Sequence, residues 1–273
     1  MNQRNSIPAI VVFDIDGVIR DVSGSYRRAL ADTVEQFTAQ AYRPTADDID
    51  RLKSEGVWNN DWEGSQELIY RYFETLGQSR EQVKLDYNSI VGFFQSRYRG
   101  TDPNKLTGYI CDEPLLLQSS YLNQLTEAGI RWGFFSGATR GSATYVLQER
   151  LSLKSPVLIA MEDAPGKPDP TGLFSTLELI ENVVDNRVDN INNSSTVIYV
   201  GDTVADMYTV EKARNLQSNR TWIAVGVLPP HVQETEQKRA AYTDSLKKAG
   251  ATIVLNNVQE LIPQKIQELI LRL

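Results

Sequence analysis

Two aspartates, Asp14 and Asp16, follow the first apolar run of the chain in segment 11–18 (VVFDIDGV). An acidic pair at the end of a buried strand is costly unless a ligand or a partner group uses it. One carboxylate can attack phosphorus as a nucleophile, and a second carboxyl group can move the proton of the leaving oxygen. The pair therefore predicts group-transfer chemistry, with a simple cap of the turn before Gly17 as the alternative.

Two further signals follow later apolar runs. Ser136 and Gly137 end the second run, where a hydroxyl and free backbone N–H groups can bind phosphate oxygens. Lys167 lies in a Gly-Lys-Pro-Asp-Pro loop, in which an ammonium group can neutralise a phosphate and crowded carboxylates. A common Ser-Gly turn and a solvated surface lysine are the ordinary alternatives.

Asp202 and Asp206 end another apolar run and flank Thr203-Val204-Ala205. If a helix starts near Thr203, both carboxylates project near its first turn. Hard carboxylate oxygens suit Mg²⁺, which uses only one or two protein carboxylates and keeps several waters. The pattern therefore predicts a Mg²⁺ site, and the alternative for Asp202 is an ordinary helix N-cap.

The order of these four motifs resembles the haloacid dehalogenase-like (HAD) hydrolase superfamily, and within it subfamily I, on the phosphoglycolate phosphatase and β-phosphoglucomutase-like branch. The resemblance implies that Asp14 is the nucleophile that forms an aspartyl-phosphate and that Asp16 is the acid/base. It implies that Asp202 binds Mg²⁺ together with Asp14 and the main-chain carbonyl of Asp16, with Asp206 as a supporting carboxylate.

The same resemblance gives Ser136, Gly137 and Lys167 the task of holding the phosphoryl group. Asp16 argues against a true dehalogenase and against a phosphonatase, because both lack this second acidic residue. The related mutases carry a histidine shortly after the first motif, and the single histidine here is His231. A histidine-dependent mutase step is therefore disfavoured.

Short apolar runs rich in branched and aromatic residues predict strands buried on both faces. Helical patterns separate most of them, which predicts an α/β fold with a Rossmann-like, doubly wound parallel sheet. The expected strands are Pro8–Phe13, Ile130–Phe135, Val157–Met161, Thr196–Val200, Trp222–Val225 and Thr252–Leu255.

The stretch between the first two expected strands has no convincing strand and is too long for a loop. Its periodicity predicts helices over Ser25–Ala41, Asp61–Leu76 and Arg80–Tyr98, and Thr45-Ala46-Asp47-Asp48 predicts a capping box. We expect a catalytic core of residues 1–21 and 108–273 and an inserted helical domain of residues 22–107. The resemblance identifies the insertion as a C1-type cap.

Substrate choice is expected to lie in this cap. Asn60 and Trp62, in the segment Asn59-Asn60-Asp61-Trp62, combine polar groups with an aromatic face that suits a polar metabolite. The alternative is a helix N-terminus with Trp62 in the core of the cap. Arg20 lies near the connection between the two domains, where it could reach an anionic group of the substrate, and a surface role is the more ordinary interpretation.

Composition excludes several classes of function. The net charge of −7 over 273 residues makes a nucleic-acid groove a poor expectation. The single cysteine excludes an internal disulfide and fits a reducing compartment, and no apolar window is long enough for a membrane span. We expect a cytoplasmic enzyme, a monomer or a homodimer, without a nucleic-acid or membrane partner.

The sequence thus predicts a Mg²⁺-dependent phosphatase that hydrolyses a small phosphorylated metabolite, a phosphomonoester, through an aspartyl-phosphate. Two alternatives remain at this point. One is a sugar-phosphate phosphotransferase or mutase that shares the aspartyl-phosphate step. The other is a phosphate-binding regulator without catalytic activity.

Overall fold

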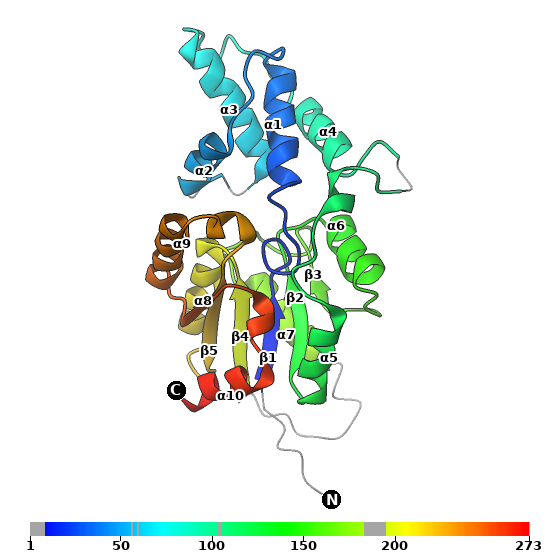
Figure 1. Cartoon of the computed structure of the whole chain (residues 1–273), viewed down its shortest axis with the longest axis vertical. Coiled ribbons are helices and arrows are strands. Elements are labelled where there is room, and N and C mark those ends of the chain that lie inside the picture. Colours follow the sequence, from blue (N-terminus) through cyan, green and yellow to red (C-terminus); the bar gives the residue numbers. More distant parts are fainter. Residues whose placement is uncertain (1–8, 56, 59, 103–104, 183–194, 273) are drawn as a thin grey trace, which may run out of the picture. The chain divides into compact units, whose positions relative to one another are not determined.

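The computed structural model describes residues 9–55, 57–58, 60–102, 105–182 and 195–272. The chain divides into two compact units, one formed by Met1–Asp21 with Leu115–Leu273 and the other by Val22–Pro114 (Figure 1). We call them the sheet unit and the helical unit. The second boundary lies after Pro114 rather than at 107/108, because the 3₁₀ turn Tyr109–Asp112 (η1) contacts helix α4 of the helical unit.

The sheet unit contains a six-stranded parallel sheet with the order β3-β2-β1-β4-β5-β6. The six strands expected from the sequence are present, and most end within one or two residues of the expected bounds. They are β1 (Ala9–Phe13), β2 (Arg131–Phe135), β3 (Leu158–Ile159), β4 (Thr196–Gly201), β5 (Trp222–Val227) and β6 (Ile253–Leu255). The doubly wound α/β fold is therefore confirmed.

Strand β1 is buried on both faces because its side chains alternate between two cores. Val11 and Phe13 belong to one core and Ile10 and Val12 to the other. Helices α5, α10 and the segment that continues α6 cover the first face, and α7, α8 and α9 cover the second (Figure 1). A strand between two helical layers has to be apolar throughout, which explains the continuous apolar runs of the sequence.

The helices of the sheet unit follow the strands in turn. They are α5 (Ser119–Glu127), α6 (Arg140–Thr144) with a π-helical continuation η2 (Tyr145–Arg150), α7 (Thr171–Asn182), α8 (Val204–Leu216), α9 (Glu236–Lys248) and α10 (Pro263–Leu271), with 3₁₀ turns η3 (Pro230–Gln233) and η4 (Val258–Glu260). The loop that the sequence predicts over Asn182–Ser195 falls on residues 183–194, which lie outside the described residues.

The helical unit is built from α1 (Tyr26–Phe37), α2 (Ala46–Ser54), α3 (Asp61–Thr75) and α4 (Tyr87–Tyr98). Helix α1 packs against both α3 and α4, and the ring of Tyr26 stacks on Tyr98 at 4.2 Å between centroids. The predicted capping box is present: the Thr45 hydroxyl accepts from the N–H of Asp48, whose carboxylate accepts from the N–H of Thr45. Among the described residues, no helix combines the length and the apolar character that crossing a membrane would require.

Two expected helices of this unit are shorter than their periodicity predicts. The helix expected from Arg80 begins at Tyr87, because Asp86 caps it by accepting from the N–H of Ser89. The preceding residues form a turn instead. In this turn the N–H of Gln82 donates to the carbonyl of Ser79, and Oε1 of Gln82 accepts from the N–H of Ser79. Helix α1 ends at Phe37 rather than at residue 41, because the backbone has positive φ at Ala39 and Gln40 and the hydroxyl of Thr38 accepts from the N–H of Tyr42. Local side-chain bonds to the backbone outweigh helix propensity at both points.

Candidate active site

The topological switch point of the sheet lies between β1 and β4. From β1 the chain proceeds to β2 and β3 on one side, and β4, β5 and β6 lie on the other. Ligands of open parallel sheets bind outside the carboxyl ends of the strands at this point. Asp14 follows β1 and Asp202 follows β4, and the N–H of Asp14 donates to the carbonyl of Val200 at 2.8 Å. The fold therefore brings together two motifs that lie far apart in the sequence.

Lys167 lies between two of the expected carboxylates. Its ammonium is 2.8 Å from Oδ2 of Asp14 and 2.7 Å from Oδ1 of Asp206, and its side chain is only 10% exposed. The ammonium also lies over the rings of Phe135 and Tyr199 at 5.4 and 5.5 Å. Burial opposes the charge of Lys167, but Asp14 and Asp206 outweigh it and raise the pKa of the ammonium above its usual range. Lys167 is thus a fixed cation at the centre of the site.

Asp206 is fully buried and accepts hydrogen bonds on both carboxylate oxygens. Oδ1 accepts from Lys167 and from the hydroxyl of Tyr199, and Oδ2 accepts from the N–H and the hydroxyl of Thr203. Thr203, not Asp202, is the N-cap of α8, and Asp206 completes its capping box. Burial opposes ionisation of Asp206, but Lys167 and the bonds from Thr203 hold its pKa below the usual range.

Asp202 packs directly against Gly17 of the first motif. Gly17 has φ +74°, and a Cβ built there would lie 2.1 Å from Oδ2 of Asp202. A side chain at position 17 would therefore be strained and would displace the carboxylate. Burial and the negative charges of Asp206 and Asp14 raise the pKa of Asp202 well above its usual range, with Lys167 opposing the shift.

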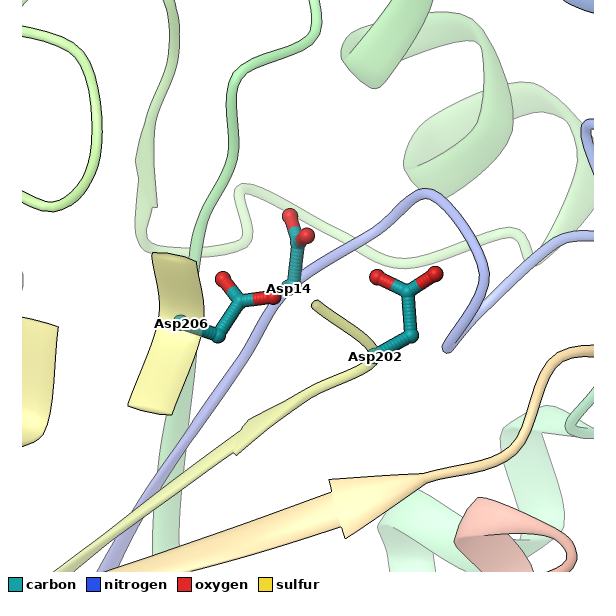
Figure 2. A group of neighbouring side chains, drawn as sticks. All are labelled: Asp14, Asp202 and Asp206. Carbon is teal, nitrogen blue, oxygen red and sulfur yellow. The ribbon is translucent and has the colours of Figure 1, made fainter. Parts of the chain in front are cut away.

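Three carboxylates meet at the ends of β1 and β4, and their donor set fits a hard divalent cation. Asp14, Asp202 and Asp206 each offer an oxygen within 4.8 Å of the others (Figure 2). Burial, with Asp206 and Asp16 adding to it and Lys167 opposing it, raises the pKa of Asp14 to about 7. Asp14 and Asp202 are thus hard to ionise where they stand, and a bound Mg²⁺ would supply the positive charge that favours their ionised forms.

Asp16 faces a cation of its own. Nε and Nη2 of Arg20 lie 2.7 and 2.6 Å from Oδ1 of Asp16. The expectation of a surface role for Arg20 is wrong, because its side chain is completely buried. The sequence signal was available: an arginine four residues after an aspartate, following the apolar Val18 and Ile19, has to find a charged partner if the segment is buried.

Ser136 and Gly137 follow β2, the other neighbour of β1. Ser136 is buried, its N–H donates to the carbonyl of Ile159, and its hydroxyl oxygen accepts from the N–H of Ala138. A Cβ on Gly137 would meet nothing within 4 Å, so the backbone there is open to approach. Their contact with a phosphoryl group stays a prediction.

Asn60 and Trp62 belong to the helical unit. Oδ1 of Asn60 accepts from the N–H groups of Trp62 and Glu63 and caps α3, which is the alternative interpretation of this segment. Trp62 is half-buried. Asn59, from the same expected contact loop, lies outside the described residues. A contact of Asn60 or Trp62 with a substrate stays a prediction.

The structure also adds a residue that the sequence analysis did not single out. Tyr199 is the fourth residue of β4 and is fully buried, with its hydroxyl donating to Asp206 at 3.1 Å. An apolar strand context hides such a residue, since a tyrosine in a buried strand usually only packs. Its role is visible only when α8 is placed beside β4.

Comparison with solved structures shows the same fold at low sequence identity. Phosphatase Tt82 from Thermococcus thioreducens is 21% identical with a TM-score of 0.61, over 85% of this chain and 98% of that one. CbbY from Rhodobacter sphaeroides, solved with phosphate, is 15% identical with a TM-score of 0.58, over 93% and 96%. A HAD hydrolase of family IA, variant 3, from Entamoeba histolytica is 12% identical with a TM-score of 0.57, over 96% and 98%.

Comparison of sequences gives the family. An imidazoleglycerol-phosphate dehydratase from Phytophthora nicotianae is 29% identical over 251 residues, which is 90% of this chain and 49% of that protein. The chain therefore spans about half the length of this relative. The model of the haloacid dehalogenase-like hydrolases matches residues 8–214, which include all four motifs. The chain belongs to the haloacid dehalogenase-like hydrolase family of enzymes.

Proposed function

We propose that this protein is a Mg²⁺-dependent phosphatase that hydrolyses a small phosphomonoester through a phosphoryl group carried on Asp14. The observation that carries the proposal is the position of Lys167, whose buried ammonium is held between Asp14 and Asp206 beside Asp202. One cation among three carboxylates leaves a net negative site. Such a site suits a divalent metal and, with it, a phosphate dianion.

The first half of the reaction transfers the phosphoryl group to the protein. A carboxylate oxygen of Asp14 attacks phosphorus, the ester P–O bond breaks, and the proton carried by Asp16 passes to the leaving oxygen to give the alcohol. Lys167, the hydroxyl of Ser136 and the backbone at Gly137 bind the phosphoryl oxygens. Fixed donors aimed at these oxygens stabilise the charge in the transition state.

The second half releases phosphate. Water attacks phosphorus, its proton passes to the Asp16 carboxylate, and the bond between phosphorus and Asp14 breaks. Asp16 is thereby ready to act as an acid again, so protons and electrons balance over one turnover.

The residues that would hold Mg²⁺ are Asp202, Asp14 and the main-chain carbonyl of Asp16. When bound, Mg²⁺ neutralises phosphoryl oxygens and favours the ionised form of Asp14. Asp206 has both of its oxygens occupied by Lys167, Tyr199 and Thr203, which favours a supporting role over direct ligation.

We propose that the helical unit acts as the cap that selects the substrate, with Asn60 and Trp62 as the contact residues. The dehydratase from Phytophthora nicotianae is named for imidazoleglycerol phosphate, which is a phosphomonoester. This compound therefore belongs among the candidate substrates, beside phosphoglycolate, sugar phosphates and nucleotides. The single cysteine fits action in a reducing compartment such as the cytoplasm.

The proposal is tested by phosphate release across such a panel with Mg²⁺, using Asp14→Asn as the blank. We expect one or a few strongly preferred substrates and complete loss in the variant. Acid quenching followed by borohydride reduction should convert residue 14 to homoserine, which mass spectrometry detects. Turnover by a folded Asp14→Asn protein would contradict the role of Asp14 as the nucleophile. Transfer of the phosphoryl group to a sugar hydroxyl instead of water would identify a phosphotransferase.

A further inference from the structure

Arg20 is the largest side chain among the described residues that is fully buried, with 0% exposure. Arginine is almost never buried completely unless it is paired, because desolvating a guanidinium is costly. Arg20 is therefore neither a solvated surface residue nor a solvent-exposed contact for the substrate. Its role depends on the group that its guanidinium binds.

The guanidinium directs two donors at a single oxygen. Nε lies 2.7 Å and Nη2 2.6 Å from Oδ1 of Asp16. Within the described part of the chain, Oδ2 of Asp16 accepts no hydrogen bond, and the side chain of Asp16 is 26% exposed. One oxygen is thus immobilised, and the other is left accessible for exchange of a proton.

Hydrogen bonds also hold the backbone of Arg20, which restrains the position of its guanidinium. Its carbonyl accepts from the N–H of Gly17 at 2.9 Å, and its N–H donates to the carbonyl of Ile15 at 3.2 Å. A bridge to Leu115, with the N–H of Leu116 donating to Ile19 at 2.8 Å, ties the turn to the rest of the sheet unit. Residues 15–20 therefore form a closed turn that carries both partners of the ion pair.

We propose that Arg20 is a positioning residue that fixes the Asp16 carboxyl group, so that its Oδ2 faces the leaving oxygen of the substrate. The inference rests on the proposed function, in which Asp16 passes that proton. Arg20 touches neither substrate nor phosphorus and acts only through Asp16. Misplacing a proton donor by an ångström is costly for catalysis, so the pair has a kinetic signature.

The signature is a dependence on the leaving group. An alkyl phosphomonoester expels a poor leaving group and needs the proton of Asp16, whereas p-nitrophenyl phosphate expels a stable phenolate and does not. We expect Arg20→Met to lower kcat/KM about 100-fold on the preferred alkyl substrate, mainly in kcat, and less than about five-fold on p-nitrophenyl phosphate. The kcat/KM of Arg20→Lys on the alkyl substrate should lie between the values of Arg20→Met and the wild type. Its loss should again be larger on the alkyl substrate than on p-nitrophenyl phosphate.

The matched control is Arg220→Met. Arg220 is a second buried arginine of the sheet unit, 9% exposed and paired with Glu181, and it precedes β5 at the opposite end of the strands from the site. We expect it to lose stability without any leaving-group bias. If Arg20→Met fails to fold, Arg20→Lys carries the test, because it retains the charge and the bias is a ratio measured within one protein.

A double-mutant cycle with Asp16→Asn isolates the proposed route. If Arg20 acts through Asp16, Arg20→Met should cost no further activity on the alkyl substrate once Asp16 is replaced. Equal losses of kcat/KM on the two substrates, or additive losses in the cycle, would overturn the inference. Failure of the proposed function would give a different result, since the wild type would then release no phosphate from any substrate or Asp14→Asn would remain active.

Discussion

At the scale of single residues, the site is a balance of buried charges. Lys167 offsets Asp14 and Asp206, and Arg20 offsets Asp16, whereas the carboxylate of Asp202 makes no hydrogen bond with any of the described residues. Asp202 is half-buried, so water solvates its carboxylate only in part, and a metal ion is the partner that the proposed function supplies. The carboxylates should therefore respond differently to replacement.

We expect Asp202→Asn and Asp206→Asn to have distinct effects on the Mg²⁺ requirement. Asp202→Asn should raise the Mg²⁺ concentration at half-maximal activity at least about ten-fold, because a ligand is weakened. Asp206→Asn should lower kcat with a smaller change in that concentration, because Lys167 loses its second anchor. The measurement is phosphate release against Mg²⁺ concentration, and identical curves for the two variants would contradict the assignment.

The contact between Gly17 and Asp202 gives a second test at this scale. Gly17→Ala should cost stability for the left-handed backbone, about 1–2 kcal/mol, and should also abolish most activity by displacing Asp202. Gly77→Ala is the matched control, because Gly77 has φ +79° but nothing within 4 Å of its added Cβ. Chemical unfolding and phosphate release of both variants measure the difference. Full activity in Gly17→Ala would show that the close approach to Asp202 is unimportant.

At the scale of elements, two strands and one helix start position the site. Asp14 and Asp202 follow neighbouring strands, β1 and β4, and Asp206 lies in the first turn of α8. The capping box of α8 serves two purposes, because the carboxylate of Asp206 that closes it also holds Lys167. Helix α2, which belongs to the helical unit, has a capping box of the same design, formed by Thr45 and Asp48.

The two capping boxes allow a comparison within one chain. We expect Thr203→Ala and Thr45→Ala each to lower the free energy of unfolding by about 1 kcal/mol. Thr203→Ala alone should also lower kcat, because Oδ2 of Asp206 loses the Thr203 hydroxyl and Lys167 becomes less firmly held. Thr203→Ser should restore activity. Equal activity of the two alanine variants would show that the cap does not support the site.

At the scale of the whole molecule, the chain is an α/β core interrupted by a helical unit that has its own core. Much of the surface of that helical unit is charged and paired. Glu67 is the most buried of these groups, and its carboxylate accepts from Arg71 at 2.7 Å and from Arg80 at 2.8 Å. Burial opposes its charge, but Arg80 and Arg71 outweigh burial and lower the pKa of Glu67 below its usual value.

The lowered pKa of Glu67 predicts an acid-sensitive helical unit. Because the folded pKa is below the unfolded value of about 4.3, the stabilisation is fully present above that pH and is lost as pH falls through the folded pKa. At pH 7, Glu67→Gln should cost the helical unit about 2 kcal/mol, and the cost should shrink toward pH 3. Hydrogen exchange of α3 and α4 peptides, compared with strand peptides, measures the effect.

The control for this measurement is Glu74→Gln. Glu74 pairs with Arg80 but is 41% exposed, so its replacement should change the stability by less than about 0.5 kcal/mol. A cost of Glu67→Gln that is independent of pH would mean that the carboxylate stabilises the unit by packing rather than by charge.

The sequence by itself determined the strands, the family and the order of the four motifs. Strands between two helical layers have to be apolar throughout, so they stand out from the pattern, and chemistry-bearing residues directly after them are conspicuous. The sequence was less successful at predicting helix ends where polar side chains compete with the helix for backbone groups. Asp86 and Gln82 illustrate this, because their side chains accept from backbone N–H groups and delay the start of α4 without disturbing its apolar periodicity.

Only the tertiary structure decided which charge faces which. Sequence places Lys167 and Asp206 39 residues apart, and their 2.7 Å contact follows from the packing of a loop against the first turn of α8. The tertiary structure also makes Tyr199 a hydrogen-bond donor to Asp206 rather than a residue that only packs, and it buries Arg20 against Asp16. The physical reason is that burial and pairing are properties of several elements at once, whereas periodicity reports only one element at a time.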